Sequence, residues 1–238
     1  SIDTGAGDDV VSYVKGSWDV SDTVNGGDGA DTLRLLSKHA VWLDGTTTQT
    51  ISFQTIEIAD ALGANVYKLE NVCADSSTLN VTGNTNNVGA AITAGAPLSV
   101  TGATIIGPAG NFTLGLGTSL ATNAAGTLAA GGKLTITDTG TGTNDSLTIN
   151  NNARVTSGAG LNVYSTQVLP ISGYETVTIG TGTVAGVANT FGAITLTGDQ
   201  SASTTLKFTG ANVVNATATL TANKIDVSGI TAAGTGTT

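Results

Sequence analysis

Residues 26–34 read GGDGADTLR, and this stretch decides which fold the sequence predicts. It matches the calcium nonapeptide pattern G-G-x-G-x-D-x-U-x, where U is apolar, at every defined position. Residues 4–12, TGAGDDVVS, match the pattern at every defined position except the first. The glycines allow a tight turn with inward carbonyl oxygens, the aspartate supplies a carboxylate, and the apolar residue anchors the next strand. Two such units predict a β-roll, in which loops and short strands alternate along a solenoid.

The spacing of the two copies predicts how they stack. Two nonapeptides form one coil of about 18 residues, so copies that begin at residues 4 and 26 indicate one coil with a short insertion. Ca²⁺ takes about six to eight oxygen ligands, so a site needs two stacked loops. We expect one calcium ion between them, bound by the carboxylates of Asp9 and Asp31 and by four carbonyl oxygens, those of Thr4, Ala6, Gly26 and Asp28. The alternative is a pair of ordinary glycine–aspartate turns without a metal.

Short units of the form apolar–polar–apolar recur in the rest of the chain, usually closed by Thr, Gly or Asn. They begin at Leu79, Leu98, Leu134, Leu147, Val177, Ile194, Leu206 and Ile225. Alternation with period two predicts short strands with one buried face, and the residues that close them favour tight corners. We therefore expect an all-β fold, a parallel β-roll or β-helix-like solenoid with short, irregular rungs. A β-sandwich remains the alternative, because frequent short strands and turns describe it equally well.

The net charge of −9 is concentrated at the start of the chain, since 12 of the 17 acidic residues lie in the first 75 positions. We divide the chain into an acidic, calcium-binding β-roll-like segment, residues 1–75, and a Thr-, Gly- and Ala-rich β-solenoid or β-sandwich segment, residues 76–238. An acidic surface lacks the basic face that binds nucleic acid or anionic lipid. No stretch approaches the roughly 20 consecutive apolar residues of a membrane-spanning helix, so we expect no membrane span.

Candidate catalytic groups are sparse, and we predict that the chain is not an enzyme. His39 is the only histidine, so a histidine-based zinc site or catalytic triad lacks parts. Residues 76–137 contain no Asp, Glu, His or Arg, whereas a polysaccharide-cleaving site concentrates such groups. The remaining acids are interpreted as isolated turn residues or lattice contacts; these are Asp138, Asp145, Glu175, Asp199 and Asp226.

The two nonapeptides resemble those of RTX proteins, and this resemblance covers about residues 3–34. Residues 171–179, ISGYETVTI, are similar to a phrase common in RTX-type surface-layer proteins and large adhesins, and residues 53–58, FQTIEI, are a looser match. The resemblance implies export from bacteria by type I secretion and folding outside the cell on meeting calcium. Two copies are few for that family, and no secretion signal is recognisable.

These observations lead to a functional hypothesis. We expect a segment of a longer protein that forms part of an extracellular bacterial surface layer at the cell surface, stabilised by Ca²⁺ and self-assembling into an array or filament. The expected partners are further copies of the chain and a cell-surface polysaccharide. The alternatives are a stalk segment of a secreted RTX-type adhesin and the noncatalytic calcium module of a secreted polysaccharide-active enzyme.

Overall fold

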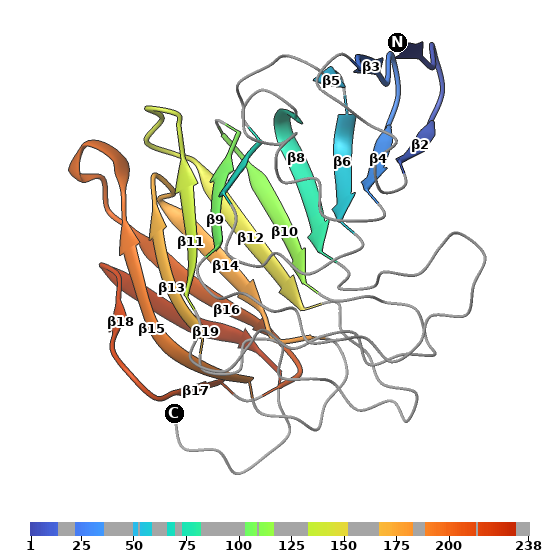
Figure 1. The fold of residues 1–238 in the computed structure, drawn as a ribbon. Helices are drawn as coiled ribbons and strands as arrows, with labels where there is room; N and C mark the ends of the chain where they lie inside the picture. The colour runs from blue at the N-terminus through green and yellow to red at the C-terminus, as the bar shows by residue number, and fades with distance from the viewer. Residues whose placement is uncertain are drawn as a thin grey trace.

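The predicted solenoid is confirmed, and the chain winds as a stack of parallel coils (Figure 1). The computed structural model describes residues 1–13, 22–35, 50–51, 53–58, 66–69, 73–81, 103–108, 110–116, 133–151, 167–182, 189–212 and 214–231. Among them no α-helix occurs, and the one helical turn is the 3₁₀ element η1 (Asp199–Ser201). Every strand pair in these ranges is parallel, which fits a solenoid and not an antiparallel sandwich.

Each coil contributes one strand to a long sheet of nine strands. In spatial order they are β2 (Val10–Tyr13), β4 (Thr32–Leu35), β6 (Phe53–Ile58), β8 (Cys73–Val81), β10 (Phe112–Leu116), β12 (Ser146–Asn151), β14 (Thr176–Gly180), β16 (Thr205–Gly210) and β19 (Lys224–Ile230). The intervening strands form the opposite wall of the solenoid. The chain therefore alternates between two walls, which is how successive parallel strands are connected without a helix.

The opposite wall consists of two sheets. At the N-terminal end, three short strands pair, namely β1 (Ile2–Asp3), β3 (Val24–Asn25) and β5 (Thr50–Ile51). The longer sheet contains β7 (Val66–Lys68), β9 (Ala103–Gly107), β11 (Leu134–Asp138), β13 (Gln167–Ser172), β15 (Asn189–Thr197), β17 (Val214–Ala216) and β18 (Leu220–Thr221). The predicted boundary at residue 75 falls inside β8, and the nine-stranded sheet continues across it, so both segments share one sheet.

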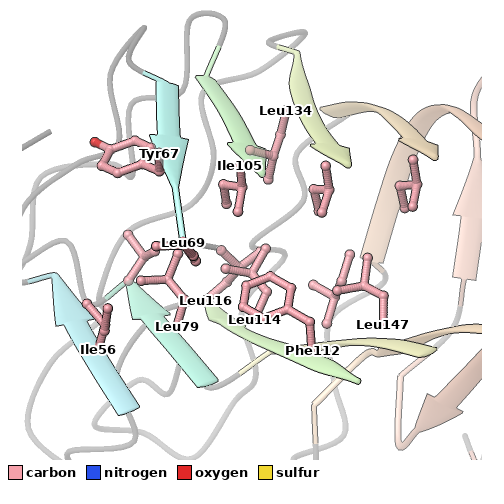
Figure 2. Close-up of a cluster of buried hydrophobic side chains, with 14 of the residues drawn as sticks. Ile56, Tyr67, Leu69, Leu79, Ile105, Phe112, Leu114, Leu116, Leu134 and Leu147 are labelled. Carbon is pink, nitrogen blue, oxygen red and sulfur yellow. The ribbon is translucent and has the colours of Figure 1, made fainter. Parts of the chain in front are cut away.

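The core is a column of apolar side chains that stack on one another from coil to coil. The register aligns Leu33, Ile56, Leu79, Leu114, Ile149 and Ile179, all fully buried. Figure 2 shows side chains of this sheet, such as Leu79 and Leu114, facing Ile105 and Leu134 from the opposite wall. The period-two pattern in the sequence thus places one residue in two inside the solenoid.

The outer face of the same sheet carries a column of threonines. Neighbouring strands align Thr32, Thr55, Thr78, Thr113, Thr148 and Thr178 in six successive coils. Each is partly exposed. Threonine suits this position because its branched side chain packs well on a pleated surface and its hydroxyl remains in contact with water.

A polar cluster replaces the apolar column near the far end of β12. Asn151 occupies the position that Leu116 holds in the preceding coil. The carbonyl oxygen of Thr181 accepts hydrogen bonds from the side-chain amides of Asn189 at 3.0 Å and Asn212 at 2.6 Å, and Asn151 approaches it at 3.4 Å. These buried amides have partners, as interior polar groups require, and they tie three coils together at one corner.

The stacked core predicts that substitutions at neighbouring residues of one strand change the free energy of unfolding by very different amounts. Leu114→Ala removes a fully buried side chain of β10 and should lower the free energy of unfolding by about 2–5 kcal/mol. Thr113→Ala, on the outer face, should cost less than about 1 kcal/mol. Denaturant unfolding of the two variants measures both values. Equal losses would contradict the assignment of inner and outer faces.

Candidate metal centre

The two glycine-rich loops stack directly on one another, as their spacing predicts. The register pairs Ile2 with Val24 and Val10 with Thr32, and an isolated bridge pairs Ala6 with Asp28, so the two copies are offset by one coil throughout. Asp28 also donates its N–H to the carbonyl oxygen of Gly5 at 2.9 Å. The loops are thus held together by backbone hydrogen bonds across the coil boundary.

Glycine is required in these loops for two separate reasons. Gly5 and Gly27 have φ angles of +89° and +82°, in the region that other residues rarely adopt. In addition, a Cβ on Gly27 would collide with the carbonyl oxygen of Gly5 beneath it, whereas a Cβ on Gly5 would meet open space. The second loop therefore needs Gly27 to allow the close approach of the two backbones. The first loop needs Gly5 only for its backbone angle.

The two predicted carboxylate ligands lie in adjacent coils at the same corner. Asp31 is fully buried, and its Oδ1 accepts a hydrogen bond from the N–H of Asp9 at 2.9 Å. The N–H of Asp31 in turn donates to Oε1 of Gln54 in the third coil at 2.7 Å. Oδ2 of Asp9 and Oδ2 of Asp31 are buried, and neither accepts a hydrogen bond. Two buried carboxylate oxygens without donors fit a cation, because buried anionic oxygens need a compensating partner.

Two of the four predicted carbonyl ligands already accept a hydrogen bond from the neighbouring loop. The carbonyl oxygen of Gly26 accepts from the Thr4 hydroxyl at 2.6 Å, and that of Asp28 accepts from the N–H of Gly7 at 2.8 Å. A carbonyl oxygen has two lone pairs, so each retains one acceptor position. No three His, Cys, Asp or Glu side chains in the described ranges are grouped so as to hold a metal. A cation between the loops therefore depends on carbonyl oxygens, and the six-residue ligand set stays a prediction.

A second acidic corner, which the sequence analysis missed, lies farther along the solenoid. Four acids interpreted as isolated come together there, from three coils: Asp138, Asp145, Glu175 and Asp199. The Glu175 carboxylate joins two of them, since Oε2 accepts from the N–H of Asp145 and Oε1 from the N–H of Asp199, both at 2.9 Å. We call these four acids, together with Tyr174, the acidic corner. Asp226 lies apart from it in β19, where hydrogen bonds from Ser228 lower its pKa.

Burial governs the electrostatics of the acidic corner. Burial and the neighbouring Asp145 carboxyl raise the pKa of Asp138 to about 6, against the lowering effect of a hydrogen bond from the Gly140 N–H. Tyr174 is fully buried, and its hydroxyl has no hydrogen-bond partner. Burial, and then the charges of Asp138 and Asp145, raise the pKa of Tyr174. The phenol oxygen lies against Gly107, the residue that pairs with Asp138 in the sheet.

The same type of hydrogen bond between neighbouring coils occurs at both acidic sites and at a third position. The residue just before a strand of the long sheet donates its N–H to the side-chain oxygen of the equivalent residue one coil later. The pairs are Asp9 to Asp31, Asp145 to Glu175 and Thr204 to Asn223. An acidic or amide side chain at this position thus caps the strand below it, in the way that such side chains cap a helix.

The function has to be inferred from this geometry. No protein-family model, curated protein sequence or solved structure matches the chain. No helix in the described ranges is long and apolar enough to cross a membrane, in agreement with the sequence. His39 lies outside those ranges.

The stacked loops predict unequal effects of the same substitution in the two copies. Gly5→Ala and Gly27→Ala each force alanine into a left-handed conformation, which costs about 1–2 kcal/mol. Gly27→Ala also drives a methyl group into the carbonyl of Gly5, so it should lower the melting temperature further. Thermal unfolding of both variants measures the difference. A Gly5→Ala loss as large as the Gly27→Ala loss would contradict the stacking.

Proposed function

We propose that the chain is a structural segment of an extracellular bacterial surface layer, stabilised by Ca²⁺ and assembling with copies of itself. The observation that carries this proposal is the in-register pair of glycine loops, with one donorless carboxylate oxygen on Asp9 and one on Asp31. The RTX-like sequence of these loops supports calcium over other cations.

Calcium would supply what the protein lacks at this corner. Carboxylates in adjacent coils repel one another, and burial strengthens the repulsion because the surrounding dielectric constant is low. A divalent ion between the loops would reverse that interaction and hold the first two coils together. Ca²⁺ suits an irregular shell of carboxylate and carbonyl oxygens, whereas Mg²⁺ demands near-octahedral geometry.

The outer face of the long sheet supports self-assembly. Threonines aligned in six successive coils form a weakly charged column along this face, and each of them is partly exposed. Such a uniform strip favours lateral packing of two copies of the chain, with the same surface of each copy facing the other.

We assign no catalytic step to this segment. The closest arrangement to a catalytic carboxylate pair is Asp138 with Asp145, and Asp138 is only 6% exposed. Such burial suits a structural or ion-binding role better than attack on a bulky polysaccharide.

Electron microscopy and light scattering of the purified chain, with calcium and then with excess chelator, test the proposal. We expect sheets or filaments with calcium and their dissolution by chelator. Asp9→Asn/Asp31→Asn should prevent assembly. The control Asp3→Asn/Asp226→Asn also removes two negative charges, but outside the predicted site, and should leave assembly unchanged. A chain that stays monomeric and equally folded in both conditions would contradict the surface-layer proposal and favour an adhesin stalk.

A further inference from the structure

The acidic corner holds more negative charge than its hydrogen bonds compensate. Oδ2 of Asp138, Oδ2 of Asp145 and Oδ2 of Asp199 are all buried, and none accepts a hydrogen bond. The ion pairs formed among described residues, Arg34 with Glu57 and Lys224 with Asp226, lie elsewhere. Buried carboxylate oxygens are costly unless a donor or a cation meets them.

A second observation at the same place is independent of the acids. Tyr174 is fully buried with an unpartnered hydroxyl, although buried tyrosine hydroxyls usually find a partner. Its oxygen lies so close to Gly107 that a Cβ there would collide with it, and Gly107 is the sheet neighbour of Asp138. A neutral polar group is thus directed toward the acidic corner, and it has no hydrogen-bond partner among the described residues.

We propose that the acidic corner is a second calcium site, in which Asp138 and Asp145 bind the ion directly and Asp199 closes the site from a neighbouring coil. This site is distinct from the predicted one at Asp9 and Asp31. It uses no copy of the complete glycine-rich nonapeptide, and it joins three coils in the second half of the chain.

The other members of the corner position these ligands. Both oxygens of Glu175 are engaged, one by the N–H of Asp145 and one by the N–H of Asp199, so Glu175 fixes the backbone on either side of the ion. Oδ1 of Asp138 is held by the N–H of Gly140 at 2.8 Å, which leaves Oδ2 for the metal. The Tyr174 hydroxyl is placed to donate to a ligating carboxylate or to a water on the ion.

The chemistry of the donors selects calcium. The candidate ligands are oxygens, without the nitrogen or sulfur that zinc and copper prefer. No three acidic side chains in the described ranges are grouped so as to hold a metal by themselves, so the ion needs carbonyl or water oxygens in addition to Asp138 and Asp145. Ca²⁺ tolerates such an irregular shell and takes further carbonyl or water oxygens, which Mg²⁺ does less readily.

The test uses the chain with its predicted N-terminal site removed by Asp9→Asn/Asp31→Asn, so that the two sites are separated. Calorimetric titration of this variant with calcium should still show binding. Adding Asp138→Asn/Asp145→Asn should weaken that binding by about tenfold or more, because the ligands lose their charge. Asp226→Asn, added to the same background, is the control for a lost carboxylate and should leave the affinity unchanged.

Terbium(III) provides a second readout that does not depend on stability. Tb³⁺ replaces calcium in oxygen-rich sites and emits when a nearby phenol transfers energy to it, so Tyr174 should sensitise it. Tyr174→Phe in the same background should abolish this emission while calcium binding persists. Absence of calcium binding in the Asp9→Asn/Asp31→Asn variant, or equal affinity after Asp138→Asn/Asp145→Asn, would overturn the second site. In that case Asp138 and Asp145 share a proton instead of an ion, whatever the outcome at the N-terminal loops.

Discussion

In-register parallel pairing is the constraint on which the rest of this structure depends. It places each side chain about 4.8 Å from the residue that holds the same position in the next coil. Every position must therefore tolerate a column of similar neighbours. Leu79 and Leu114 satisfy this condition by packing inside, and Thr113 and Thr148 satisfy it on the outer face. In the glycine loops the same closeness leaves no room for a side chain at Gly27.

Acidic residues are where such stacking becomes costly, because like charges then lie one above another. Some carboxylate oxygens accept a backbone N–H from the preceding coil: Oδ1 of Asp31 accepts from Asp9, and Oε2 of Glu175 accepts from Asp145. The Oδ2 atoms of Asp9, Asp31 and Asp145 are buried and remain without a hydrogen-bond donor. The two proposed calcium sites follow from this common feature, since a divalent ion is the simplest partner for oxygens that the backbone cannot reach.

Much of the nine-stranded sheet could be predicted from the sequence, because alternation marks each strand locally, as at Leu147 and Val177. The opposite wall was harder to predict. β13 contains Pro170, which is unusual within a sheet, and its pairing with β11 begins only at Ile171, after the missing N–H. The acidic corner could not be predicted, since Asp145 and Glu175 meet only because one coil happens to be 30 residues long. The coils have no fixed period, so spatial neighbours cannot be read from spacing. The two nonapeptides were the exception, because their own repeat gives the register.

Hydrogen exchange of backbone amides, measured with calcium and with chelator, tests most directly whether an ion holds the first coils in register. The amides of Gly7 and Asp28, which bond across the two loops, should exchange slowly with calcium and much faster with chelator. The amides of β10, in the apolar middle of the solenoid, should exchange at the same rate in both conditions. Equal protection of Gly7 and Asp28 with and without calcium would contradict this role for the ion and leave the loops as ordinary turns.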